Sequence, residues 1–176
     1  MDFNAIWARV QRALKRESGF FAEVGNDPKA TTEAFVVVIV AGLISGLGPI
    51  IGPGRFRVGS WIFSIVGSAI GLAVGVGILW LISKLFKGNG EYINLLRAGG
   101  YASAPTALGI IPFIGAIAGA IWAILLMIKA VKETQNTSDG GAIATVLIPA
   151  AVIGLLVLLI VVVIGVALLG FAASNN

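Results

Sequence analysis

The sequence predicts an all-α integral membrane protein with five transmembrane helices and an N-terminal amphipathic interfacial helix. Three observations carry this prediction: 58% of the 176 residues are hydrophobic, only 11% are charged, and the mean hydropathy is +1.01. A soluble domain has roughly 25% charged residues, so this chain has too little charge to solvate a globular surface. A soluble domain and a disordered chain are therefore both excluded.

Five long apolar runs mark the predicted spans, because a helix needs about 20 apolar residues to cross a bilayer. Their approximate bounds are 34–51, 60–86, 93–111, 115–131 and 142–173. Trp61 and Trp80 are nineteen residues apart. In a helix this separation is about 28 Å, so the two indoles are expected at opposite membrane interfaces. Pro149 is expected to kink the last span.

The stretch 93–131 is the least certain part of this topology. One helix of this length would extend to roughly 58 Å, nearly twice the hydrocarbon thickness. The segment from Ile111 and Pro112 to Gly115 offers a break, so we interpret the stretch as a helical hairpin. One long helix is the alternative.

Basic residues predict the orientation, because they concentrate on the cytoplasmic side of membrane proteins. With five spans, ten of the twelve lysines and arginines fall on the side of the N-terminus, and only Arg55 and Arg57 fall opposite. The N-terminus is therefore expected in the cytoplasm and the C-terminus outside. With four spans the split would worsen to eight and four, because Lys129 and Lys132 would move outside.

Residues 1–24 are predicted to form an amphipathic cytoplasmic or interfacial helix, joined by a linker at 25–33 to the bundle at 34–174. Apolar residues recur at helical spacing from Phe3 to Leu14, with basic residues on the other face. This pattern is typical of a helix in the headgroup plane. The predicted surface for membrane or partner binding comprises Trp7, Arg9, Arg12, Lys15 and Arg16. Plain packing on the cytoplasmic ends of the spans is the alternative.

Small residues four positions apart lie on one helix face and let helix backbones approach closely. Seven of the 24 glycines have this spacing and are predicted helix-packing positions: Gly42 and Gly46, then Gly67, Gly71 and Gly75, then Gly115 and Gly119. We interpret them as contacts within the chain. Homodimerisation is the alternative.

The third predicted span contains a mildly polar patch: Arg97, Tyr101, Ser103, Pro105 and Thr106. Arg97 is expected to extend to the cytoplasmic interface and to pair with Glu91. A lipid-phosphate or substrate-binding role is the alternative. The hydroxyls are expected to bond to backbone carbonyls or to a neighbouring helix.

The sequence has few residues of the types that usually carry out catalysis, metal binding or proton transport. It contains no cysteine and no histidine, and the middle third of each predicted span carries no Asp, Glu, Lys or Arg. This argues against thiolate or imidazole catalysis and against proton-coupled transport. We therefore expect a protein that is not an enzyme, with no catalytic residue, metal site or cofactor, and with no nucleic-acid partner.

Three segments carry a family resemblance: Ile6-Trp7-Ala8-Arg9-Val10 leading to Phe20-Phe21; Gly100-Tyr101-Ala102-Ser103-Ala104-Pro105; and Ile121-Trp122 to Lys129-Ala130-Val131-Lys132-Glu133. On these segments the chain resembles the Yip family of Ypt/Rab-interacting membrane proteins, over roughly residues 5–170. The resemblance implies a five-span bundle with a cytosolic N-terminus. Eukaryotic members act in vesicle traffic and bind prenylated Rab GTPases. Only about 33 residues precede the first span here, so the chain is similar to a compact prokaryotic member.

The expected function is a non-enzymatic scaffold or adaptor in membrane organisation or a trafficking-like process, in the plasma (inner) membrane of a prokaryote. The expected partners are the bilayer, with anionic lipid at its cytoplasmic face, and a membrane or cytoplasmic protein; homo-oligomers are left open. The alternative function is a transporter or scramblase for lipid or an uncharged small solute. It is motivated by the broken segments near Pro49 and Pro112 and by the polar patch.

Overall fold

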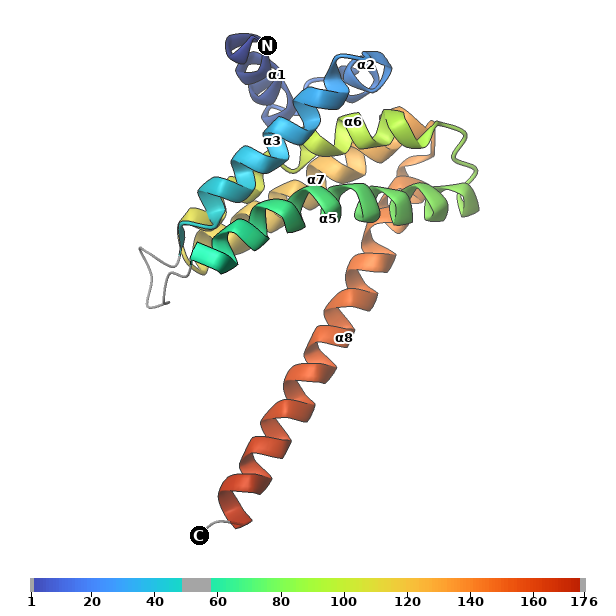
Figure 1. Cartoon of the computed structure of the whole chain (residues 1–176). Coiled ribbons are helices and arrows are strands. Elements are labelled where there is room, and N and C mark those ends of the chain that lie inside the picture. The colour runs from blue at the N-terminus through green and yellow to red at the C-terminus, as the bar shows by residue number, and fades with distance from the viewer. Residues whose placement is uncertain (1, 49–57, 175–176) are drawn as a thin grey trace.

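The chain folds into helices joined by short connections (Figure 1). The computed structural model describes residues 2–48 and 58–174, and these ranges contain no strand. The elements are α1 (Phe3–Leu14), α2 (Phe20–Asn26), α3 (Ala30–Ser45), α5 (Val58–Leu85), α6 (Tyr92–Ala102), the 3₁₀ helix η1 (Ala104–Ile110), α7 (Ile114–Gln135) and α8 (Asp139–Ser174). The prediction of an all-α membrane protein is confirmed.

Three helices are long and apolar enough to cross a membrane within the described residues: Trp61–Leu85, Ile114–Gln135 and Asp139–Ala167. A fourth crossing results if α2 and α3, which meet at an angle of 116°, are counted as one broken span. The structure thus supports three to four spans by length and composition, and the predicted total of five stays a prediction. The proposed end of the first span at Pro49, together with Arg55 and Arg57, lies outside the described residues.

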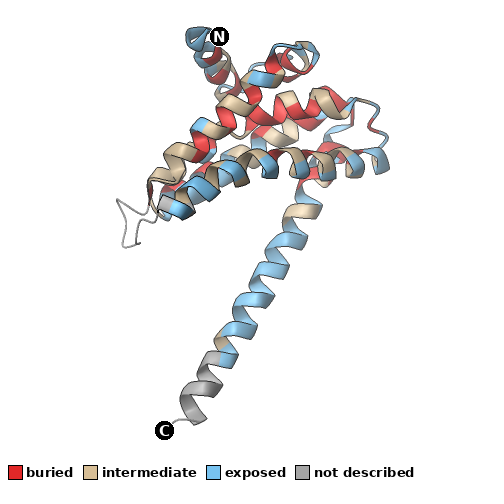
Figure 2. Cartoon of the chain, viewed as in Figure 1, coloured by how far each residue is buried: buried red, intermediate tan, exposed pale blue. Residues whose placement is uncertain are grey.

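The core forms where α3, α5, α6 and α7 pack side by side, with α1 and α2 lying over one end (Figures 1 and 2). Its largest fully buried side chains include Phe20, Phe21, Tyr101, Leu95 and Leu126. Phe20 meets Phe21 and Tyr101 edge to face, at centroid distances of 5.3 and 5.7 Å. Such pairs add roughly 0.5–1.5 kcal/mol beyond the burial of their apolar area. The two phenylalanines thus fasten the short helix α2 to the bundle.

Residues 93–131 form a hairpin and not one long helix. The chain reverses around Phe113, which has a φ of 62°, and η1 then packs along α7. The predicted continuous span 93–111 is nevertheless wrong in detail, because α6 ends at Ala102 and the chain continues as the 3₁₀ helix η1. Pro105 near the start of η1 has no N–H to continue the α-helical ladder, which accounts for the change.

The N-terminal segment contains two helices where the sequence predicted one amphipathic helix over 1–24. The break falls between α1 and α2, where Arg16 and Gly19 have positive φ values of 57° and 75°. The predicted linker 25–33 is also largely helical, since it contains the end of α2 and the start of α3. Asp27 lies in the bend between them, where its side chain accepts a hydrogen bond from the Lys29 N–H.

The last helix, α8, leaves the bundle after its first three turns (Figures 1 and 2). Ala142, Thr145 and Val146 are buried, whereas the described residues from 151 onward are almost all exposed and apolar. α8 runs as a single helix through Pro149. Its long exposed apolar surface suits a lipid environment.

Candidate functional site

The N-terminal helix α1 is held to the bundle by a buried apolar face and an arginine. Asp2 caps the helix by accepting hydrogen bonds from the N–H groups of Asn4 (2.9 Å) and Ala5 (3.3 Å). Ile6, Val10 and Ala13 are buried on the face toward the bundle. A basic residue beside this face, Arg9, makes the polar contacts that fix the position of α1.

Arg9 donates to two acidic residues on the next elements of the chain. Its guanidinium lies 2.6 Å from Asp27 Oδ2 and 2.7 Å from Glu33 Oε2. The Tyr101 hydroxyl of α6 donates to the same Glu33 oxygen. Charge-assisted bonds of this kind are about twice as strong as neutral ones. Arg9 therefore joins α1 to the α2–α3 bend and, through Glu33, to α6.

Arg97 lies beneath this junction and ties α6 to the same bend. Its side chain donates to Thr31 Oγ1 and to the Gly25 carbonyl, both at 2.8 Å. The predicted salt bridge between Arg97 and Glu91 is therefore wrong, because the guanidinium turns toward the α2–α3 bend. The sequence could not show this contact, since the residues of the bend are more than sixty positions away from Arg97.

Arg12 closes the turn between α1 and α2. Its guanidinium bonds to Glu17 (2.9 Å) and Glu23 (2.6 Å) and lies 5.0 Å from the centre of the Phe20 ring. These hydrogen bonds from Arg12 lower the pKa of both carboxyls. Arg9 and Arg12, both predicted membrane-binding residues, are therefore each paired with two carboxylates of the same chain, Arg9 at a part-buried position and Arg12 at the surface. Lys15 and Arg16 stay exposed.

Glu133 of α7 anchors the start of α2 and was missed by the sequence reasoning. Its carboxylate accepts hydrogen bonds from the N–H groups of Gly19 (3.1 Å) and Phe21 (2.9 Å). One turn earlier on α7, Lys129 donates to the main-chain carbonyls of Arg16 and Glu17. The two residues also approach each other to 3.7 Å. Their four-residue spacing was the only signal in the sequence.

These contacts define the charged end of the bundle, which comprises α1, α2, the α2–α3 bend with Glu33, the residues Arg97 and Tyr101 of α6, the α5–α6 connection and the end of α7. The α5–α6 connection joins it through Asn89, whose N–H donates to the Gln135 carbonyl at 3.0 Å. Gln135 in turn donates to the Glu91 carbonyl at 3.1 Å. Trp80 donates to the Gly90 carbonyl at 3.1 Å. Segments far apart in the sequence are therefore fixed at one end of the molecule.

Phe3 and Trp7 form an exposed aromatic edge on α1, with 69% and 60% of their surface exposed. They lie one helical turn apart, beside an apolar groove of about 210 Å³ between α1, α3 and η1. Val40 and Ile44 of α3 line the same groove. Arg9 of α1 thus bonds to carboxylates within the protein, while Phe3 and Trp7 are exposed beside α3.

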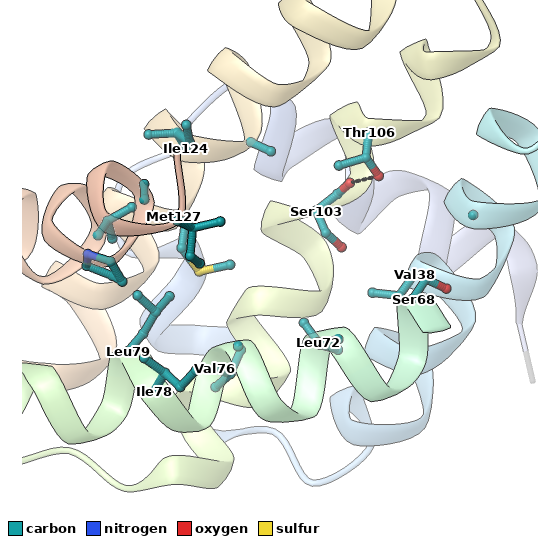
Figure 3. A pocket seen from close by; sticks show the side chains of 18 of the residues that line it. Val38, Ser68, Leu72, Val76, Ile78, Leu79, Ser103, Thr106, Ile124 and Met127 are labelled. Atoms are coloured by element: carbon teal, nitrogen blue, oxygen red, sulfur yellow. Dashed lines mark hydrogen bonds between the residues drawn. The ribbon is translucent and has the colours of Figure 1, made fainter. Parts of the chain in front are cut away.

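A larger groove of about 560 Å³ opens between α3, α5, α7 and the start of α8 (Figure 3). Among the residues that line it are the hydroxyl-bearing Ser45, Ser64, Ser68, Ser103 and Thr106, and no lining residue carries a charge. The predicted polar patch is therefore divided. Ser103 and Thr106 face this groove, Arg97 and Tyr101 belong to the charged end, and Pro105 is buried against α7, close to Gly119.

The predicted packing glycines also fall into two groups. A Cβ on Gly42 would lie 2.9 Å from Ser68 Oγ, and one on Gly46 would lie 2.6 Å from the Trp61 ring, so these glycines let α3 approach α5. Gly115 and Gly119 similarly approach η1. The other group does not pack as predicted: Gly67, Gly71 and Gly75 have nothing within 4 Å of an added Cβ.

The fold and these contacts define a helical membrane protein with one charged end and apolar spans. No group of three or more acidic side chains within residues 2–48 and 58–174 is placed to hold a metal ion. The Yip1 domain family model matches residues 12–162, which is most of the chain. The protein therefore belongs to the Yip1 domain family, as the resemblance predicted. No curated protein and no solved structure matches the chain.

Proposed function

We propose that this Yip1-domain protein is a non-enzymatic scaffold or adaptor that presents the α1–α2 unit at the cytoplasmic surface of a prokaryotic plasma membrane. One observation carries the proposal. α1 is fixed to the bundle through Arg9, yet Phe3 and Trp7 on the same helix keep more than half of their surface exposed. A helix held in this way is a preformed surface, and binding to it costs little ordering entropy.

Lipid is the first expected partner of this surface. Aromatic side chains favour the membrane–water interface, because their rings bury apolar surface at the boundary between the headgroups and the acyl chains. The exposed cations Lys15, Arg16 and Lys29 lie in the same unit. Each contributes about 1 kcal/mol near an anionic leaflet. Because Arg9 and Arg12 are paired with four carboxylates, the attraction to anionic lipid rests on these three residues and is reduced by the two carboxylates in excess.

The charged end supports the proposed orientation. The N-terminal helices, the α5–α6 connection and the end of α7 are hydrogen-bonded together, so they belong on one side of the membrane. Most of the positive charge in the sequence lies there, which favours the cytoplasm. α8 starts at this end, and its C-terminus is therefore expected outside. In this arrangement the chain crosses five times, and the third pass comprises α6 and η1.

Spin labels on single cysteines test the interfacial position of α1 in the full chain, reconstituted in vesicles containing anionic lipid. The protein has no cysteine of its own. A label replacing Trp7 is expected at the depth of the lipid carbonyls, and a label replacing Ala5, which is exposed about 160° around the helix from Trp7, is expected in water. Equal exposure of both labels to a water-soluble relaxation agent would contradict membrane contact by α1.

The adaptor role is tested by crosslinking in cells followed by mass spectrometry. A recurrent protein partner crosslinked through Lys15 or Lys29 is expected, since both amines are exposed on the α1–α2 unit. The matched control is Lys129, whose side chain is only 19% exposed and donates to the main-chain carbonyls of Arg16 and Glu17. Recovery of no partner in repeated experiments, with normal membrane organisation in a deletion strain, would contradict the role.

A further inference from the structure

The large groove between α3, α5, α7 and α8 changes its chemistry along its length. On α5 it extends from Ser64 to Leu79, which is fifteen residues or about 22 Å along the helix. Hydroxyl groups line the part remote from the charged end. Apolar side chains line the other part, including Val76, Leu79 and Met127. Figure 3 shows this division, with Ser68, Ser103 and Thr106 on one side and Leu79, Ile124 and Met127 on the other.

The hydroxyls of the groove donate their protons within their own helices. Ser64 and Ser68 of α5 each donate to the carbonyl three residues earlier at 2.7 Å, and Ser103 donates in the same way to Gly100. Such local bonds satisfy the hydroxyl proton and leave the oxygen lone pairs available. Within the described part of the chain, the polar part of the groove therefore offers hydrogen-bond acceptors and no charged side chain.

We propose that this groove binds one glycerolipid that carries a free hydroxyl on its glycerol backbone, which we call the neck of the lipid. The acyl chain lies along Leu72 to Leu79 of α5, and the neck hydroxyl donates to the serine oxygens near Ser64 and Ser68. Among residues 2–48 and 58–174 no cation lines the groove, so a phosphate buried against these residues would lack a counter-charge. The assigned ligand is therefore a neutral lipid such as a diacylglycerol. The proposal goes beyond the scaffold role and does not depend on it.

Two glycines of α5 allow a test that leaves the fold intact. Gly71 lines the groove, and an added Cβ there meets nothing within 4 Å. Gly67 lies one turn earlier, is equally unobstructed and is not among the lining residues. Gly71→Leu should therefore fill the groove without disturbing the bundle, and Gly67→Leu is its matched control on the same helix.

The experiment uses the full chain in vesicles that contain a diacylglycerol with a photoactivatable group in its acyl chain. Labelled residues are mapped by mass spectrometry. We expect labelling concentrated on residues 72–79 and Met127, several-fold lower in Gly71→Leu and unchanged in Gly67→Leu. Acetylating the neck hydroxyl of the probe should reduce labelling of the wild type. The Ser68→Ala variant should lose part of this discrimination.

Three outcomes would overturn the proposal. Labelling spread evenly over the exposed face of α8 would show only a surrounding lipid layer. Equal labelling by the free and acetylated probes would exclude recognition of the neck. Efficient disulfide formation between cysteines replacing Gly71 and Ile160, within one chain or between copies, would show that α8 covers the groove instead of a lipid.

Discussion

Arg9 and Glu33 are joined by a 2.7 Å ion pair that fixes the first helix against the third. The same Glu33 oxygen accepts the hydroxyl of Tyr101 from α6, so one carboxylate connects three helices. Glu33 is largely buried, with 16% of its side chain exposed. An acidic group in this position is stabilised only when it is paired, which makes this junction sensitive to substitution.

Replacing Arg9 by alanine is expected to release α1. The change leaves Glu33 and Asp27 without their cation, at an expected cost of about 1–3 kcal/mol. Hydrogen exchange should become faster in α1 and at the α2–α3 bend, while α5 and α7 keep their protection. Arg16→Ala removes an exposed arginine and serves as the control. Unchanged exchange in α1 of the Arg9→Ala variant would contradict the role assigned to this pair.

Glu133→Gln is expected to loosen α2. The carboxylate accepts two main-chain N–H groups, from Gly19 and Phe21. The amide has one acceptor oxygen and no charge, so at least one of these bonds is weakened. Limited proteolysis between α1 and α2 should therefore be faster. Asp139→Asn, which alters an exposed ion pair with Lys132, should leave the cleavage rate unchanged.

Acid is expected to weaken the attachment of α1. The hydrogen bond from Arg9 lowers the pKa of Asp27 below its ordinary value of 3.8. Because the folded state favours the ionised carboxylate, its contribution is fully present above this ordinary value and is lost as the pH falls through the lower pKa of the folded state. Spin-label mobility in α1, or hydrogen exchange there relative to the intrinsic exchange rate at each pH, should thus be constant near neutral pH and rise only in strong acid. Loosening that begins above pH 6 would contradict the assignment.

Gly100→Ala is expected to disrupt the contact between α6 and α3. The added Cβ would lie 2.6 Å from the Cα of Ala34, which is backbone and cannot move aside cheaply. Overpacking of this kind costs about 1–3 kcal/mol. The midpoint of thermal unfolding in detergent should fall. Gly75→Ala, where nothing lies within 4 Å, should keep or raise the midpoint, because alanine favours the helix.

Much of the fold follows from local sequence patterns. The apolar runs predict the helices α5, α7 and α8, and the break near Pro112 predicts the reversal between η1 and α7. The periodicity of α1 predicts a helix with one apolar face. It could not show that Ile6 is buried while Trp7 is exposed, because that depends on where α3 and η1 lie.

The site was less accessible to sequence reasoning, because it is built from distant residues. Arg9 and Glu33 are 24 positions apart, and Gly19 and Glu133 are 114 positions apart. In the sequence alone, Arg9 and Arg12 have the helical spacing of basic residues on the polar face of a membrane-surface helix. Only their distant carboxylate partners show that they bind within the protein. Glycine spacing likewise identified Gly42 as a packing position but not its partner Ser68, and it gave no means of distinguishing Gly42 from the open positions at Gly71 and Gly75.

The most direct test of the account is the side of the membrane on which each end of α8 lies. Single cysteines replace Ser138, just before α8, and Ser174, at its last residue. A membrane-impermeant reagent is expected to modify position 138 only in inside-out vesicles and position 174 only in intact cells. Modification of both positions from the same side would contradict the proposed arrangement of the charged end and α8.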